Sequence, residues 1–445
     1  MRYLRPTGYL NWVLPAMIVL AAAEVLLSGR DLSMVYAELA GVVEATRHPA
    51  MPWVQRAVTL VLLLVSIERI VHHFIEHQPV PSMPLLVAYV LYWLASVATP
   101  ALFGAHPLLG HEYTYSLIIG LAALLVTTEE ITDIVDTARD ALFVLMLVSV
   151  ALVPLWPTLV LDSSYTQGLL PGVPRLGGVA THPVAMGMFA QTGLLLLWAR
   201  PYLHGWLNLP AWALGLGVLF FAQSKAAWVA FVLCSFILIA VRHGPSAWRR
   251  LGDPREGSFG ILLCLGGLVF GAALLGVVLF TNLGGEFSDF LNTQQGAQLM
   301  TMTGRDQIWA IAMEEWQASP IFGYGPGLFD DDFRQSIAMP NATNAHNQFL
   351  DTLARSGVVG ASCLVIYAGV LLVLSLMYAR RTGGLSLALF VALAVRSVSE
   401  VPLSLFGYST EFFAHLLLVA TLAAGASVRV QATAARPRGA YGVPA

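Results

Sequence analysis

Lysine occurs once in this chain, at Lys225 in the stretch FFAQSKAAWVAF, among 23 lysine and arginine residues. Gln223 and Ser224 precede it, and apolar sequence flanks the triplet on both sides. At the edge of a membrane a lysine extends its charge to water at little cost, whereas at the bilayer centre it costs about 3 kcal/mol. One interpretation is that the Lys225 side chain only extends its ammonium group to the membrane interface, but that role does not require two polar neighbours. The triplet therefore favours a polar site that binds an anion.

His346 is the residue best suited to move a proton. It lies in NATNAHNQFLDTLARSGVVG, where we expect Asn344 to cap a helix that holds His346 in its first turn and ends at Gly357. A neutral imidazole can accept a proton near neutral pH. The free N–H groups of a first helical turn also attract anions. His346 is therefore the candidate general base, and the adjacent Asn347 is a candidate substrate-binding residue.

Further candidate residues lie in two other segments. Arg305 opens an amphipathic helix predicted between Thr303, its expected N-cap, and Pro320. A cation there opposes the helix dipole, so its position indicates a bound anion or a partner carboxylate. Arg175 is the preferred third cation. The remaining candidates for substrate binding are His182, Gln223, Ser224 and Arg47. The sequence leaves open whether four arginines bind the donor, bind the acceptor or pair with acidic residues: Arg47, Arg56, Arg175 and Arg334.

We predict no metal and no cofactor. The run Asp330, Asp331 and Asp332 could hold Ca²⁺ or Mg²⁺, but such runs in polar loops are usually only solvated. No cluster of histidine and cysteine has the spacing of a zinc site. The segment IFGYGPGLF demands a tight turn but is not a phosphate loop, because no strand precedes it and no Gly-Lys-Ser/Thr follows.

Membrane helices must position these residues. The 445-residue chain is 57% hydrophobic and only 11% charged, with a mean hydropathy of +0.72, which is outside the range of soluble globular proteins. We therefore predict an all-α polytopic membrane protein. Apolar runs long enough to cross about 30 Å of hydrocarbon indicate about twelve transmembrane helices, near 9–29, 57–72, 83–103, 113–127, 141–161, 183–199, 209–223, 226–242, 259–280, 357–378, 384–400 and 411–428.

The distribution of arginine predicts the orientation. With twelve spans, both termini lie on one side, and that side gathers 14 of the 23 basic residues, which makes it the cytoplasm. The acidic stretch 127–140 is expected to be a solvated cytoplasmic connector. We divide the chain into transmembrane helices 1 to 9 (1–280), a large external loop with amphipathic helices and the catalytic motifs (281–356), transmembrane helices 10 to 12 (357–428) and a disordered cytoplasmic tail (429–445).

Four short motifs resemble those of the O-antigen ligase family. They are RLGGVATHP (175–183), QSKAAW (223–228), TGRDQIW through GYGPGLF (303–329) and AHNQFLDTLARSGVVG (345–360). The resemblance implies a glycosyltransferase of the C-type architecture in the bacterial inner membrane, with its active site facing the periplasm. It also implies transfer of a glycan from undecaprenyl pyrophosphate to lipid A–core oligosaccharide, with membrane lipid as the surroundings and no nucleic-acid partner.

The resemblance also assigns roles to residues. The family's essential loop histidine matches His346, and the arginine that opens its loop helix matches Arg305. Another functional cation, usually arginine after serine, matches Lys225, which keeps the charge but loses the planar fork of a guanidinium. Two cations could neutralise a leaving pyrophosphate, and no carboxylate pair is placed for a covalent intermediate, so we expect single displacement with inversion.

Two alternatives remain open. An O-antigen polymerase or a protein O-oligosaccharyltransferase would use the same donor with a different acceptor. A transporter or flippase would belong to another class, but transporters usually show two similar halves, and no such correspondence is visible in this sequence.

Overall fold

The computed structural model describes residues 6–34, 48–163, 172–251, 305–339, 342–408 and 410–434. Almost all of its regular structure is helical. Helices α3, α4 and α9 each carry proline in the first turn, where the missing N–H costs nothing. The elements are η2 (Pro6–Trp12), α1 (Val13–Ser28), η3 (Leu32–Met34), α3 (Met51–Ile75), α4 (Met83–Trp93), η4 (Leu94–Ala98), α5 (Thr99–Phe103), α6 (Tyr113–Ala123), α7 (Ile131–Leu152), α8 (Pro157–Val160), β1 (Leu161–Asp162), β2 (Arg175–Leu176), α9 (Pro183–Ala199), α10 (Gly205–Phe221), α11 (Lys225–Leu251), α15 (Arg305–Ala318), α16 (Asp331–Ser336), α17 (Gln348–Tyr378), α18 (Leu385–Ser397) and α19 (Thr410–Ala434).

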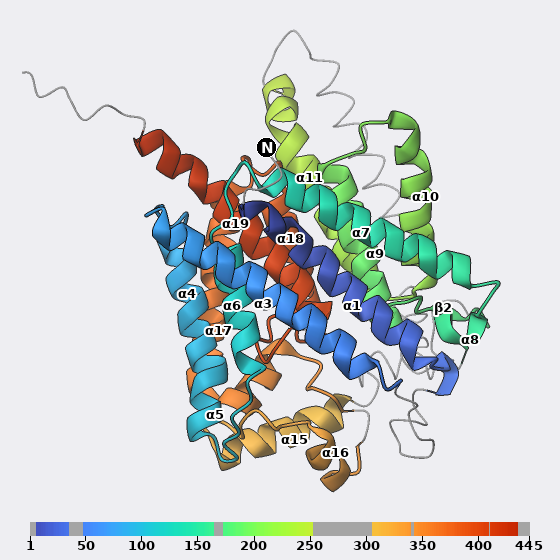
Figure 1. Ribbon diagram of the computed structural model, residues 1–445, viewed down its shortest axis with the longest axis vertical. Coiled ribbons are helices and arrows are strands. Elements are labelled where there is room, and N and C mark those ends of the chain that lie inside the picture. Colours follow the sequence, from blue (N-terminus) through green and yellow to red (C-terminus); the bar gives the residue numbers. More distant parts are fainter. Residues whose placement is uncertain are drawn as a thin grey trace, which may run out of the picture.

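The helices form a multi-pass membrane bundle (Figure 1). Among the described residues, six helices are long and apolar enough to cross a membrane, and four shorter apolar helices accompany them. Helix α9 is buried along nearly its whole length, whereas α3 and α17 expose large apolar side chains such as Leu60, Leu64, Val365 and Ile366. An apolar outer surface around a buried core is typical of a polytopic membrane protein. The predicted ninth span, 259–280, lies outside the described residues.

Helix α7 differs from the prediction. We expected a solvated connector over 127–140 and a separate span over 141–161, but one continuous helix runs from Ile131 to Leu152. Its first turns bury Ile134, Val135 and Ala138 on one face, and that face packs into the bundle. The acidic residues of this stretch are therefore the polar face of an amphipathic helix.

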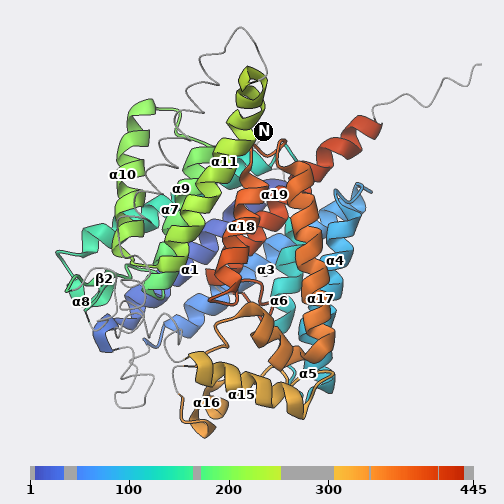
Figure 2. The same cartoon turned by 180° about the vertical axis from the view of Figure 1, so that it is seen from behind.

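The two ends of the bundle are different. Helices α15 and α16 lie together at the lower end in Figures 1 and 2, and β2 and the first turn of α11 lie above them, in the lower half of the bundle. The beginning of η2 and the end of α19 lie at the upper end. We call the lower end the α15 end. All the described candidate residues belong to elements or loops at this end or in the half of the bundle next to it.

Helix α17 is broken at Gly357, and the loop that follows α15 hydrogen-bonds to the helix at this break. Gly357 has a non-helical backbone, with φ 61° and ψ −164°, so the carbonyls of the preceding turn lack helical partners. The loop from Pro320 to Gly325 supplies them: the N–H groups of Tyr324 and Gly325 donate to the carbonyls of Ala354 and Arg355 at 2.8 and 3.0 Å. The predicted helix end at Gly357 and the predicted tight turn in IFGYGPGLF are thus parts of one hydrogen-bonded structure.

Candidate functional site

The backbone before α17 fixes His346. The Oδ1 atom of Asn344 accepts the N–H of His346 at 2.7 Å, and the N–H of Ala345 donates to Oδ1 of Asp351 at 3.0 Å. The indole N–H of Trp309, on α15, donates to the carbonyl of Ala345 at 2.9 Å. Both polar backbone groups of Ala345 are therefore occupied, which holds the next residue in place.

His346 does not lie in a first helical turn, so that prediction was wrong. Its φ of 46° is left-handed, and the helix begins two residues later at Gln348 with Asn347 as N-cap. Asn347 is the better cap because its Oδ1 accepts the N–H of Leu350 at 3.1 Å. His346 instead projects from the turn that enters the helix.

Glu400, which the sequence analysis missed, is the partner of His346. It follows α18, and its Oε2 lies 3.2 Å from Nδ1 of His346. The Glu400 side chain is only 15% exposed. Burial alone would raise the pKa of this carboxyl, but the hydrogen bond and charge of His346, with the charges of Arg396 and Arg305, lower it overall. The carboxylate therefore accepts from Nδ1–H, which leaves the Nε2 lone pair of His346 free to take a proton.

Arg305 also faces Glu400. Its Nη2 lies 3.9 Å from Glu400 Oε1, too far for a hydrogen bond but close enough for charge attraction. A carboxylate thus offsets the cation at the start of α15, one of the two explanations expected for it. The guanidinium of Arg396, which is buried, hydrogen-bonds Glu411 and adds positive charge behind Glu400.

The charges of Glu400 and of Arg175 both act on His182. Its Nδ1 accepts the N–H of Val184 at 3.2 Å and caps α9. Burial, followed by the charge of Arg175, lowers the pKa of His182 to about 4, and Glu400 acts on it in the opposite direction. The imidazole is therefore neutral at pH 7 with its proton on Nε2, and it lies within electrostatic reach of both Arg175 and Glu400.

Arg175 supports the turn that precedes Lys225. It lies on β2, whose Arg175 pairs with Asp162 of β1, and it is only 4% exposed. Its Nε donates to the carbonyl of Ala222 at 3.3 Å. Lys225 itself is exposed and begins α11. Arg175 is therefore buried against the turn, whereas Lys225, which follows the turn, is exposed.

Gln223 and Ser224 build the same turn. Gln223 has a left-handed backbone with φ 50°, and its Nε2 donates to the carbonyl of Val173 at 3.0 Å. Ser224 is buried against α9, where a Cβ on Gly187 would come within 2.7 Å of the serine Cβ. The polar neighbours of Lys225 therefore shape the joint between α10 and α11.

The remaining candidates fall elsewhere. Arg47 and Thr303 lie outside the described residues. Asp330 caps α16 by accepting the N–H of Phe333 at 2.8 Å, and Asp331 pairs with Arg334. In the part of the chain that the structure describes, no three side chains of His, Cys, Asp or Glu gather closely enough to hold a metal ion. The guanidinium of Arg56 lies 5.4 Å from the Trp53 ring centroid.

Comparison with known families supports the reading of these motifs. Residues 210–365 match the family described as O-antigen ligase. This segment carries the domain of the O-antigen ligase family. The matched segment includes Lys225, Arg305 and His346 and ends before Glu400. Enzymes of this family, which includes ligases, polymerases and oligosaccharyltransferases, are bacterial membrane proteins that transfer lipid-linked glycans. A search of curated proteins finds no match to the chain.

The contact between Trp309 and Ala345 gives a first prediction. Replacing Trp309 with phenylalanine removes one hydrogen bond, worth about 1 kcal/mol, and loosens the turn that carries His346. We expect glycan transfer to fall about fivefold, measured as the initial rate at saturating donor. Trp316 on the same helix is the matched control, because its indole N–H donates to Pro320, away from His346. Equal effects of Trp309→Phe and Trp316→Phe would contradict a positioning role.

Proposed function

We propose that the chain is an O-antigen ligase that joins a glycan from undecaprenyl pyrophosphate to a hydroxyl of lipid A–core oligosaccharide. The observation that carries this proposal is the pair of His346 and Glu400, 3.2 Å apart, with Arg305 beside it. The match of residues 210–365 to the O-antigen ligase family supports a lipid-linked glycan as donor. The site would face the periplasm, since we assign the arginine-rich opposite side to the cytoplasm of a bacterial inner membrane.

Proton transfer begins at the acceptor. The Nε2 atom of His346 takes the proton of the sugar hydroxyl as the oxygen attacks the anomeric carbon of the donor. Glu400 accepts the Nδ1–H bond, fixes the tautomer and stabilises the imidazolium that forms. The bond between the anomeric carbon and the pyrophosphate oxygen breaks in the same step, so the configuration inverts. Single displacement needs no covalent sugar intermediate.

The departing pyrophosphate carries the negative charge. Arg305 is held near Glu400 by charge rather than by a hydrogen bond, so its N–H groups can turn to phosphate oxygens. Lys225 is exposed at the joint between α10 and α11 that Arg175 supports. Together the two cations would stabilise the leaving group without a metal ion. His182 would bind substrate as a neutral donor through Nε2, and Asn347 would bind it from beside His346.

The acceptor decides between this proposal and its relatives. Purified protein is incubated with lipid-linked glycan and, in separate reactions, with lipid A–core, a second lipid-linked glycan or a peptide containing serine and threonine. We expect product on lipid A–core and a restored lipopolysaccharide ladder in a ligase-deficient strain. Product only as longer lipid-linked glycan would identify a polymerase, and product only on peptide an oligosaccharyltransferase. Movement of donor without any transfer would identify a flippase.

Lys225 provides a prediction for the leaving-group site. Replacing it with alanine removes a charge near the pyrophosphate, and we expect transfer to fall about tenfold. Lys225→Arg keeps the charge and should retain most activity. The measurement is the rate of transfer at equal amounts of protein in the membrane. If Lys225→Ala is as active as the wild type, the lysine serves only to reach the interface.

A further inference from the structure

A second site lies at the end of the bundle opposite the α15 end. A pocket of about 160 Å³ is lined by the start of α7, the residues that end α9, the turn between α17 and α18, and α19. It is smaller than the roughly 300 Å³ at the low end of small-molecule pockets. Its volume suits a headgroup rather than a whole substrate. No residue of the proposed catalytic group contributes to it.

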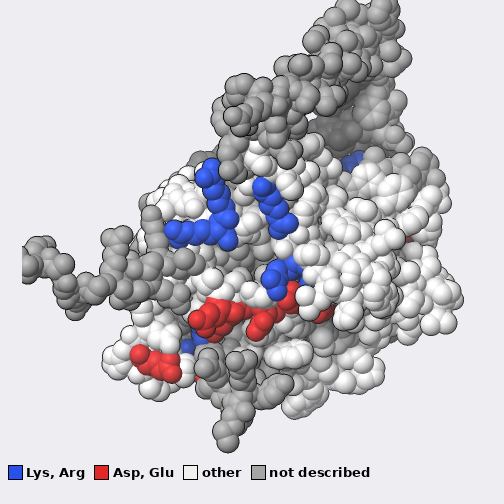
Figure 3. Space-filling view, turned by 90° about the horizontal axis from the view of Figure 1, so that it is seen from above, with Lys and Arg blue, Asp and Glu red and all other residues white. Residues whose placement is uncertain are grey.

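The pocket lining carries positive charge. Arg200 and Arg381 both line it, and none of its lining residues is acidic. The lining also contains Thr132, while Ile131 and Leu385 make part of it apolar. Figure 3 shows the same end from above, with basic side chains gathered beside a row of acidic ones on a largely uncharged face. An anion entering the pocket would therefore meet the guanidinium of Arg381 and that of Arg200, whose charge Asp136 partly offsets.

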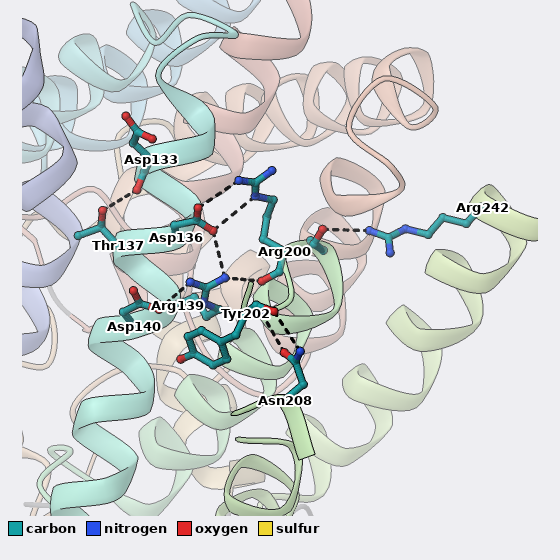
Figure 4. A network of polar contacts seen from close by, with 10 residues as sticks. Asp133, Asp136, Thr137, Arg139, Asp140, Arg200, Tyr202, Asn208 and Arg242 are labelled. Atoms are coloured by element: carbon teal, nitrogen blue, oxygen red, sulfur yellow. Dashed lines mark hydrogen bonds and ion pairs between the residues drawn. The ribbon is translucent and has the colours of Figure 1, made fainter. Parts of the chain in front are cut away.

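Hydrogen bonds with neighbouring residues fix the position of Arg200. Its Nη2 donates to Asp136 of α7 at 3.1 Å, and Asp136 also pairs with Arg139 at 3.1 Å. The guanidinium of Arg139 donates in turn to the carbonyl of Arg200 and lies 4.2 Å from the Tyr202 ring centroid. Figure 4 shows this network fixing Arg200 between α7 and α9. Asp133 and Asp140 flank the network on α7 without lining the pocket.

The guanidinium of Arg381 keeps N–H groups that can donate to a ligand. Its Nη1 donates to the carbonyl of Gly425 at 3.2 Å, and its guanidinium lies 5.6 Å from the Tyr378 ring centroid. Within the described residues, its Nε–H and Nη2 have no hydrogen-bond partner. These groups form the flat edge of a guanidinium, which matches two oxygens of a phosphate.

The surroundings of the pocket favour a lipid over a free anion. On α17, Leu376 and Met377 are 56% and 49% exposed, and they immediately precede the turn that carries Arg381. Acyl chains could pack there while the headgroup enters between the helices. Basic pockets between membrane helices are suited to phosphate headgroups because charge attraction and apolar contact act together.

We propose that this pocket binds the phosphate headgroup of an anionic membrane phospholipid, with Arg381 and Arg200 as its cationic contacts. The headgroup would link α7, the end of α9, the turn before α18 and α19, which lie far apart in the sequence. Bound lipid should therefore stabilise the packing of these four segments. The lining offers no carboxylate for a choline ammonium, so phosphatidylglycerol should bind better than phosphatidylcholine.

The test uses the purified full chain in detergent. Phosphatidylglycerol, phosphatidylcholine and inorganic phosphate are added separately, and lipid retention by native mass spectrometry and Tm are measured. We expect phosphatidylglycerol to be retained and to raise Tm. Arg381→Gln should weaken its binding about fivefold, and the Arg200→Gln, Arg381→Gln double variant about 25-fold. Arg381→Lys should retain most binding.

Arg380 provides the matched control. It is exposed, adjacent in sequence and not part of the lining, so Arg380→Gln should bind like the wild type. Thr132→Tyr fills the pocket while keeping both cations, and it should also lose phosphatidylglycerol, which covers the case in which Arg381→Gln does not fold. Equal binding by the wild type, Arg381→Gln and Thr132→Tyr would overturn the site. If inorganic phosphate displaces phosphatidylglycerol and raises Tm equally, the ligand is a free anion and the lipid is overturned.

Discussion

Replacing His346 with alanine is expected to lower the rate of glycan transfer at least about 100-fold, because it removes the group that takes the acceptor proton. Glu400→Gln should have a comparable effect, roughly 100-fold. A glutamine in this place can turn its amide N–H toward Nδ1, which would favour the tautomer whose proton is on Nε2 and block the base. Both losses should appear in kcat more than in KM.

The double variant distinguishes a catalytic pair from two independent contributions. If Glu400 acts only through His346, the variant that carries both His346→Ala and Glu400→Gln should be no slower than His346→Ala alone. Glu314, exposed on α15, is the control, and Glu314→Gln should leave the rate unchanged. Wild-type transfer by Glu400→Gln would show that the observed contact does not orient the base. Losses that multiply in the double variant would point to a separate role for Glu400, such as holding Arg305.

The bundle was largely predictable because hydropathy is a local property. Apolar runs identified the helices in the described parts of the chain, and α7 was misjudged only because its acidic face obscured a buried face. Lys225 stood out because a charge is costly beside apolar segments, and Arg305 and His346 stood out because of their expected places at helix starts. Each of these residues belongs to a short motif whose composition alone is informative.

The partner of His346 could not be predicted in the same way. Glu400 is separated from it by 54 positions and looked like the last residue of the predicted span 384–400. Only the packing of α18 against α17 brings the two side chains together. One signal was present, since a carboxyl at the end of an apolar run is rarely tolerated without a partner. The cap of α17 was likewise missed: Asn344 was expected, but Asn347, three residues further on, is the N-cap, and only the backbone distinguishes the two.

Gly357 carries the largest expected effect on folding. Its backbone lies in a region that is almost restricted to glycine, where strain costs about 1–3 kcal/mol for other residues. A Cβ at this position would come within 2.2 Å of the carbonyl oxygen of Ile321, in the loop that completes the broken turn of α17. We expect Gly357→Ala to destabilise the protein by ~3 kcal/mol or more, seen as a lower Tm and less monodisperse protein after extraction.

The same helix supplies the control for this prediction. Gly369 lies in α17 beyond the break, and a Cβ there would meet nothing within 4 Å. Gly369→Ala should leave Tm unchanged or raise it slightly, because alanine is the better helix former. If the two variants have the same Tm, α17 can close its break without cost. If Gly357→Ala alone unfolds, the loop from Pro320 to Gly325 and the broken turn act as one unit, and this unit fixes α15, with Arg305 and Trp309, against the turn that carries His346.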